Sequence, residues 1–191
     1  MRVARNWVER NSATNGAFKV VQFNALANTL STTVSFPFTD PKWLVWENRK
    51  DRLLEEIEHA NGDLIGLSEI DETTYQDTFL PFFTSKSIES IFLKKPSNQD
   101  GCVMAWNSKA FAKKEDLKIN YQNSNQVVIV ARFCSVSSGN SLVFAVTHLV
   151  VFLSHRFKYF LTTTCIKYRK LAWGKKIQPL EQGKLRSFLR K

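Results

Sequence analysis

The chain has 191 residues and carries 27 Lys and Arg against 17 Asp and Glu, a net charge of +10. This length suits one domain with a hydrophobic core, and 43% hydrophobic residues exclude a globally disordered chain. Three cysteines without a C-x-x-C pair argue against a disulfide scaffold or a zinc knuckle. We therefore expect a reducing compartment, the cytoplasm, with the mitochondrion as the alternative.

The excess positive charge lies at one end of the chain. Residues 1–149 hold 16 basic and 16 acidic side chains, whereas residues 150–191 hold 11 basic side chains and one acid, Glu181. A nucleic-acid-binding domain would spread such charge over a face, so this pattern indicates a compositional break at Val150. The most apolar stretch, Leu142–Leu153, is too short to predict a membrane span.

The first half of the chain alternates predicted strands and helices. Phe18–Asn24 is nearly continuous in apolar residues, which predicts a strand buried on both faces. A Ser- and Thr-rich loop, Asn28–Pro41, leads to a helix predicted over Trp43–His59. A second strand is predicted over Asp63–Asp71 and a short helix over Thr73–Phe83.

The second half is predicted to consist mainly of strands. Two short strands are expected over Ser90–Leu93 and Gly101–Trp106. Val127–Cys134 and Leu142–Leu149 then form a hairpin around Ser137–Asn140. This order of elements predicts a layered α/β or α+β domain with one mixed sheet.

Polar residues interrupt the apolar runs where three predicted strands end, and ligand sites in α/β sheets lie beyond strand ends. The Glu69 carboxylate can ligate Mg²⁺, the Asn24 amide can orient a phosphate oxygen, and His148 can move a proton. Lys95 can neutralise a substrate phosphate. Each residue also has a structural interpretation: a turn or cap for Asn24 and Glu69, a hydrogen-bonded core residue for His148, and a solvated turn for Lys95. These residues alone leave both interpretations open.

Seven short segments occur in the order and spacing of a known family. They are Val20–Ala27, Trp46–Lys50, Asp63–Asp71, Lys95-Pro96, Asp100–Cys102, Asn125–Val127 and Ala145–Leu149. In these segments the chain resembles the deadenylase-like branch of the endonuclease/exonuclease/phosphatase superfamily, from about Phe18 to Leu149. The resemblance implies a two-layer α/β sandwich flanked by helices. It also implies Mg²⁺-dependent hydrolysis of a phosphoester by in-line attack of water.

The resemblance also implies a role for each candidate residue. Asn24 matches the family's phosphate- and metal-site Asn, and Glu69 matches its metal-ligating Glu. Lys95 matches a substrate-phosphate Lys, and His148 matches the active-site His. The implied substrates are NADP(H), which would lose its 2′-phosphate, or poly(A) RNA, which would be shortened from its 3′ end.

The chain departs from the family directly after His148-Leu149, where Val150 replaces a Lys. Omitting 150–169 brings Lys170 to that place, so we predict Lys170 as a second substrate-binding residue. The chain then divides into four parts: an N-terminal extension (1–17), the N-terminal part of the domain (18–149), an atypical basic insert (150–169) and a resumption of the domain (170–191). We interpret the insert as an intron read in frame, with a lineage-specific insertion as the alternative.

Two later family motifs, Asp-x-Asn and a terminal Asp-His pair, do not occur in the sequence. We therefore expect a sandwich that is incomplete at its C-terminus and an isolated chain with little or no activity. The competing interpretation is a non-catalytic product whose basic tail binds nucleic acid or a protein partner.

Overall fold

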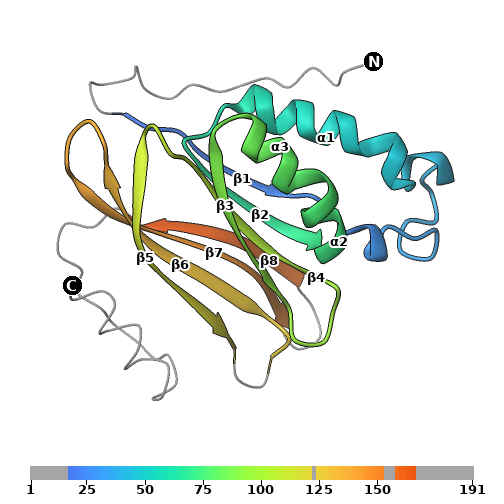
Figure 1. The fold of residues 1–191 in the computed structure, drawn as a ribbon. Helices are drawn as coiled ribbons and strands as arrows, with labels where there is room; N and C mark the ends of the chain where they lie inside the picture. The colour runs from blue at the N-terminus through green and yellow to red at the C-terminus, as the bar shows by residue number, and fades with distance from the viewer. Residues whose placement is uncertain (1–16, 122–123, 153–157, 167–191) are drawn as a thin grey trace.

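The computed structural model describes residues 17–121, 124–152 and 158–166, and from residue 149 onward it describes the backbone alone. Two four-stranded sheets form the body of the protein (Figure 1), with strand orders β1-β2-β4-β3 and β5-β6-β7-β8. The strands are β1 (Val20–Asn24), β2 (Leu64–Asp71), β3 (Ile88–Lys94), β4 (Asp100–Asn107), β5 (Phe111–Asn120), β6 (Val127–Ser135), β7 (Ser141–Phe152) and β8 (Lys158–Ile166). The two-sheet fold implied by the family resemblance is therefore confirmed, and the single mixed sheet inferred from element order is wrong.

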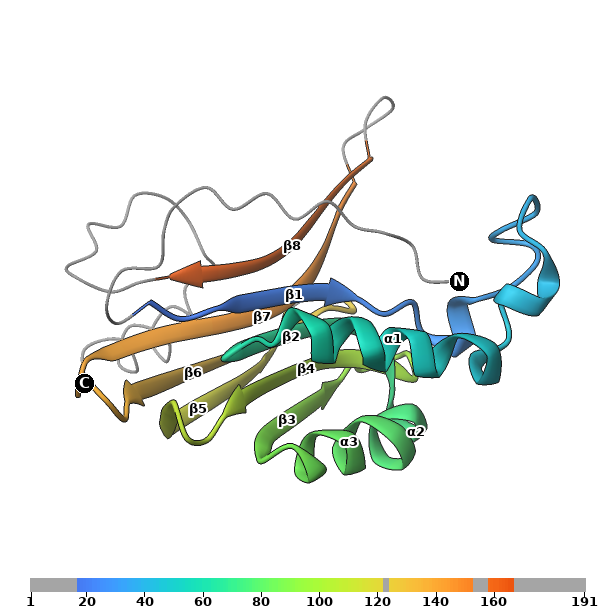
Figure 2. The same cartoon turned by 90° about the horizontal axis from the view of Figure 1, so that it is seen from above.

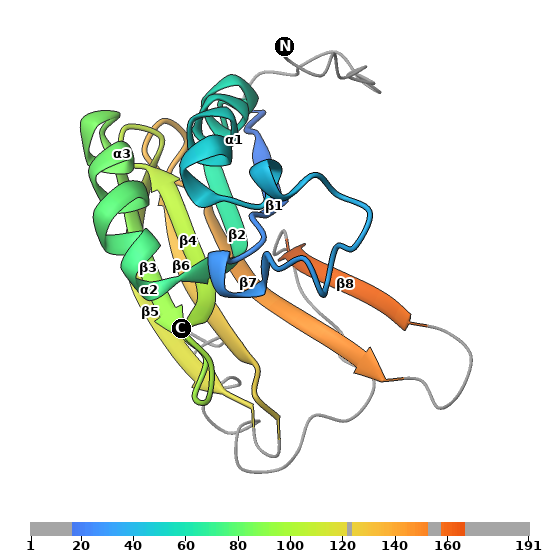
Figure 3. The same cartoon turned by 90° about the vertical axis from the view of Figure 1, so that its right-hand side faces the viewer.

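The helices pack on the outer face of the first sheet (Figures 1 and 3). They are α1 (Trp46–Ala60) and a continuous helical run of α2 (Glu72–Thr74), the π-helical turn η3 (Tyr75–Phe79) and α3 (Leu80–Ser85); two 3₁₀ turns, η1 (Asn28–Leu30) and η2 (Pro41–Trp43), precede them. Helix α1 begins three residues later than predicted, because Asp40 and Pro41 start η2 instead. It ends at Ala60 and is capped by Asn61, whose φ of 47° is left-handed. None of the helices in the described part of the chain is long and apolar enough to cross a membrane.

The first sheet is mixed, because β1 runs parallel to β2 while β2–β4 and β3–β4 are antiparallel. The strand predicted over Phe18–Asn24 exists as β1, but it is not buried on both faces. Val20 is 37% exposed, and no residue of β1 is buried. The reason is position: β1 pairs with β2 at the edge of its sheet, where fewer neighbours cover it.

Alternation along β2 and β4 divides the core into two layers. Leu64, Met104 and Trp106 point to the second sheet, where they meet Phe133 and Phe144. The intervening residues of the same strands point to the helices, and these are Ile65, Leu67, Val103 and Ala105. Each large apolar side chain buried in this way contributes about 1.5–3 kcal/mol. The first sheet consequently packs against the second sheet on one face and against the helices on the other, as the view in Figure 2 shows.

Strand β5 was not predicted from the sequence. Its middle is rich in charge and carries Lys113, Lys114, Glu115 and Asp116. In the structure it pairs with β6, and Arg132 Nη2 of β6 lies 2.7 Å from Glu115 Oε1. A charged edge strand of this kind lacks the apolar alternation on which strand prediction depends.

A predicted insert at 150–169 should take no part in the sandwich, and for two stretches of this segment that expectation is wrong. Strand β7 continues to Phe152, and β8 pairs antiparallel with it from Phe152↔Lys158 to Val143↔Ile166. The β8 sequence is rich in aromatic and β-branched residues, which favour a strand wherever an edge is open. That 150–169 is an insertion stays a proposal, and Lys170 lies outside the described residues, as do 1–16.

Candidate active site

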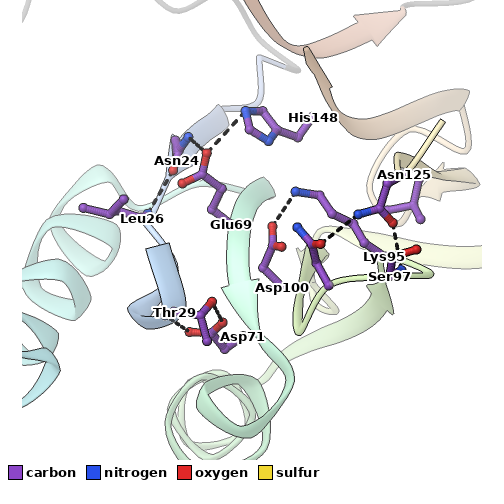
Figure 4. A network of polar contacts seen from close by, with 12 residues as sticks. Asn24, Leu26, Thr29, Glu69, Asp71, Lys95, Ser97, Asp100, Asn125 and His148 are labelled. Atoms are coloured by element: carbon purple, nitrogen blue, oxygen red, sulfur yellow. Dashed lines mark hydrogen bonds and ion pairs between the residues drawn. The ribbon is translucent and has the colours of Figure 1, made fainter. Parts of the chain in front are cut away.

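Three predicted site residues, from both sheets, lie together (Figure 4). Asn24 ends β1, and its Nδ2 donates a hydrogen bond to Glu69 Oε1 on β2 at 2.9 Å. His148 on β7 places Nε2 3.5 Å from the same oxygen. Only Asn24 is at a strand end, because Glu69 lies inside β2, which continues to Asp71, and β7 continues past His148 to Phe152. The fold thus gathers an amide, a carboxylate and an imidazole at one point.

Glu69 is directed to this point by an irregularity in β2. The pairing of β2 with β4 shifts register between Ser68 and Ile70, and Glu69 has a φ of 56°. A bulge of this kind re-aims one side chain out of the regular alternation. The left-handed conformation costs a non-glycine residue about 1–2 kcal/mol, so the rest of the sheet must maintain it.

The Asn24 amide is oriented by the loop that follows β1. Its Oδ1 accepts a hydrogen bond from the Leu26 backbone N–H at 2.9 Å, which leaves Nδ2 to face Glu69. Arg49 of α1 donates from Nη1 to the carbonyl oxygens of Ala25 (3.1 Å) and Leu26 (2.8 Å). Helix α1 therefore supports the loop, and the loop supports the amide.

Asp71, the last residue of β2, supports the next part of the same loop. It is buried and accepts hydrogen bonds from Asn28 N (2.6 Å), Thr29 N (3.3 Å) and Thr29 Oγ1 (2.7 Å). Both carboxylate oxygens are used within the protein. We therefore assign Asp71 a structural role, which the sequence indicated only as an acid at the end of a strand.

Lys95 and Asp100 form a buried ion pair beside the cluster. Lys95 is 4% exposed and Asp100 is 1% exposed, and the Lys95 ammonium bonds to Asp100 Oδ2. Buried charges are tolerated when they are paired in this way. The second oxygen, Asp100 Oδ1, has no hydrogen-bond partner among the described residues. Sequence reasoning missed Asp100, although an acid directly before Gly101-Cys102 at a strand start was a visible signal.

The imidazole of His148 is influenced by all of these charges. Burial lowers its pKa below the ordinary value, and the Lys95 charge lowers it further, while Glu69 and Asp100 raise it. The balance favours the neutral ring. The pKa effects also show that Lys95 and Asp100 belong to the same electrostatic neighbourhood as Glu69 and His148.

The donor set is compatible with Mg²⁺. No group of three or more His, Cys, Asp and Glu that could hold a metal occurs in the described part of the chain. Mg²⁺ does not require one, because it is usually bound by one or two carboxylates together with waters and substrate phosphates. Glu69 supplies such a carboxylate, and the unsatisfied Asp100 Oδ1 adds an oxygen acceptor nearby. Glu69 is thus the residue that would hold the ion.

A shallow groove of about 450 Å³ adjoins this region at the start of α1. Asn28, Leu44 and Trp46 are among its lining residues, and Asn28 also donates its backbone N–H to Asp71. The groove contains none of the clustered residues.

Comparisons with known proteins agree with the geometry, although no family model matches the chain. Nocturnin of Xenopus laevis is 32% identical over 156 residues, covering 74% of this chain and 40% of that protein. The structure of the human Nocturnin catalytic domain with bound sulfate superposes with a TM-score of 0.60 at 27% identity, covering 72% of this chain and 51% of that one. These similarities support assignment of the chain to the endonuclease/exonuclease/phosphatase superfamily.

Two further proteins are similar at lower sequence identity. The CCR4-Not complex 3′-5′-exoribonuclease subunit Ccr4 of Debaryomyces hansenii is 24% identical over 170 residues, covering 73% of this chain and 20% of that protein. ANGEL2, described as a 2′,3′-cyclic phosphatase, shares the fold with a TM-score of 0.65 over 70% of this chain and 41% of that one, at 21% identity. The chain spans about 20–40% of the length of these Ccr4 and Nocturnin relatives.

Nocturnins of frog, mouse and human are all among the similar proteins, at 32%, 29% and 29% identity. A nocturnin-like assignment within the superfamily is therefore supported.

Proposed function

We propose that the chain carries the phosphate-binding half of a Mg²⁺-dependent phosphoester hydrolase. The observation that carries the proposal is that Asn24 of the first sheet and His148 of the second sheet both approach Oε1 of Glu69. The names of the relatives support the same chemistry, since Ccr4 is an exoribonuclease and ANGEL2 a cyclic phosphatase.

Each side chain has a distinct task in this proposal. Glu69 would hold Mg²⁺, and the bound ion would supply the positive charge that stabilises the equatorial phosphoryl oxygens. The Asn24 amide orients the Glu69 carboxylate. Neutral His148 can accept a proton or donate a hydrogen bond to a phosphoryl oxygen. Lys95, once a phosphate competes with Asp100 for its ammonium, adds a second positive charge.

For the substrate we propose the 2′-phosphate of NADP(H) or the 3′ end of poly(A) RNA. Both place a phosphate ester on an adenosine ribose. NAD⁺ differs from NADP⁺ only by the absent 2′-phosphate, which makes the two a matched pair of ligands. Tighter binding of NADP⁺ than NAD⁺ favours the phosphatase substrate, and tighter binding of oligo(A) than of either favours the RNA.

The experiment that tests the proposal measures Mg²⁺ binding to the chain by titration calorimetry, with and without NADP⁺ or oligo(A). Glu69→Gln keeps the shape of the side chain and removes its charge, so we expect at least a tenfold loss of Mg²⁺ affinity. The free energy of such a loss is about that of one hydrogen bond to a charged group. Glu72→Gln, an exposed acid paired with Lys94, is the matched control. Equal Mg²⁺ affinity in Glu69→Gln and the unsubstituted chain would refute the assignment. Phosphate or AMP release, measured in parallel with and without EDTA, tests hydrolysis itself.

The charge distribution supports a second candidate, binding of nucleic acid through the basic end of the chain. Eleven of the 27 basic residues lie in 150–191 with a single acid. Binding of this kind would weaken steeply with salt and would not distinguish oligo(A) from oligo(U). It would also be unchanged by Glu69→Gln, which separates it from binding at the proposed active site.

A further inference from the structure

We propose that Asn125 is a positioning residue that holds Lys95 in place from the opposite sheet. The inference rests on the proposed function for the part that makes Lys95 a phosphate contact. The two hydrogen bonds by which Asn125 holds the loop, here called the Asn125 clamp, can be tested without any substrate.

The side chain of Asn125 bonds to the β3–β4 loop at two consecutive residues (Figure 4). Its Oδ1 accepts a hydrogen bond from the Ser97 backbone N–H at 2.8 Å, and its Nδ2 donates to Asn98 Oδ1 at 2.9 Å. Asn125 lies just before β6 of the second sheet, whereas the loop belongs to the first sheet. One amide therefore connects the two sheets at the loop that carries Lys95.

The loop has little else to hold its tip. At its base, Lys95 N donates to the Asp100 carbonyl oxygen at 3.0 Å, and Gln99 O accepts from Glu72 N at 3.0 Å. Between them, Pro96, Ser97 and Asn98 are exposed. Pro96 has no N–H to donate. Ordering exposed backbone has an entropic cost, so the Asn125 bonds act where the loop is otherwise least restrained.

The position of Lys95 depends on this loop because Lys95 is its first residue. The Lys95 ammonium is buried against Asp100 and acts electrostatically on His148. A buried ammonium is stable only while its partner stays close and water stays out. When the loop opens, water reaches the ion pair and the ammonium gains freedom to leave Asp100. Asn125 consequently keeps the cation of the site at its place.

The test measures how fast Lys95 is acetylated by a dilute amine reagent, read by mass spectrometry. Lys94, the last residue of β3, has a side chain that is 37% exposed and paired with Glu72, and it is an internal reference directly before the loop. In Asn125→Ala we expect labelling of Lys95 to accelerate about tenfold relative to Lys94, because two hydrogen bonds are lost. Asn125→Asp should restore slow labelling, since a carboxylate accepts from Ser97 N–H and the Asn98 amide can turn to donate.

A second variant guards against misfolding of Asn125→Ala. Asn98→Ala removes one of the two bonds from an exposed position of the loop and should accelerate Lys95 labelling by a smaller factor. Unchanged labelling of Lys95 in both variants, in chains that still unfold cooperatively, would overturn the clamp. Equal acceleration of Lys94 and Lys95 would also overturn it, because that result indicates general loosening.

Whether Lys95 contacts a substrate phosphate is tested separately, by measuring the binding of NADP⁺ and of NAD⁺. If Lys95 contacts phosphate, Asn125→Ala weakens NADP⁺ binding and leaves NAD⁺ binding unchanged, and Asn125→Asp restores it. If labelling changes as expected while binding of NADP⁺ and binding of oligo(A) both stay unchanged, the clamp stands and the phosphate role of Lys95 is refuted.

Discussion

Glu69 occupies the left-handed backbone region with a φ of 56°, in the middle of a sheet strand. A side chain in that conformation is strained, whereas glycine adopts it without cost. The strained backbone directs the carboxylate to Asn24 and His148, so the proposed active site lowers the stability of the fold.

This strain predicts an inverted order of stability for two substitutions. Glycine in a strand normally destabilises relative to alanine, but at Glu69 we expect Glu69→Gly to be more stable than Glu69→Ala by about 1 kcal/mol. Urea unfolding of both variants at one pH measures the difference. An alanine variant as stable as the glycine variant would show that the left-handed conformation is not maintained.

The reactivity of Cys102 tests the packing of the core between the two sheets. It is fully buried between the sheets, and burial raises the pKa of its thiol to about 12. A raised thiol pKa keeps the group protonated as pH rises, so at pH 8 only about one molecule in ten thousand carries the reactive thiolate. We expect iodoacetamide at pH 8 to spare Cys102 in the native chain and to modify it after unfolding in urea.

The half-buried Cys134 is the comparison within the same chain. It should react before Cys102 in the folded protein. Modification of both cysteines at one rate without denaturant would contradict the packing described for the inter-sheet core.

At the scale of elements, β4 is one of the two inner strands of the first sheet, and it pairs with both β2 and β3. Gly101 near its start faces Ile70 of β2 and Lys94 of β3. A Cβ at Gly101 would lie 2.2 Å from the Leu93 carbonyl oxygen. Since the obstacle is backbone, the two strands would have to separate to admit even a methyl group.

We therefore predict that Gly101→Ala destabilises the chain by about 3 kcal/mol, within the range of overpacked core substitutions. Gly139→Ala is the control, because its φ of 69° is unfavourable for alanine but nothing lies within 4 Å of its Cβ position. That control should cost about 1 kcal/mol. Thermal unfolding followed by circular dichroism compares them, and equal losses would contradict the close approach of β3 and β4.

At the scale of the whole molecule, the two sheets share one core whose described members run from Leu64 to Val146. Segment 150–169 adds the end of β7 and β8 at one edge of the second sheet. We propose that the domain proper is 18–149, resumed at 170. On this proposal Lys170 follows His148 by two positions when 150–169 is removed, which puts both on one strand face.

Deleting 150–169 tests this division of the chain. We expect the shortened chain to unfold cooperatively at no lower urea concentration than the full chain, and to bind NADP⁺ more tightly through Lys170. Lys170→Met in the shortened chain should remove the gain. If the shortened chain instead unfolds earlier, β8 is an integral strand and the insertion hypothesis is wrong.

The sequence by itself determined the positions of most elements and the identities of the residues that gather at the site. Helix α1 and strands β2, β4 and β6 were predicted because their apolar residues follow one local period. Asn24, Glu69, Lys95 and His148 were found because polar residues interrupted those periods and matched a family pattern.

The tertiary structure decided what depends on partners distant in sequence. The charged strand β5 exists because β6 accepts it as an edge, and β1 is exposed because it lies at an edge. The bulge at Glu69, the Lys95–Asp100 pair and the Asn125 clamp arise only when separate strands are brought together. Local periodicity reports which face of an element is buried. It contains no information about which element lies opposite, because that choice is made by non-local packing and hydrogen bonding.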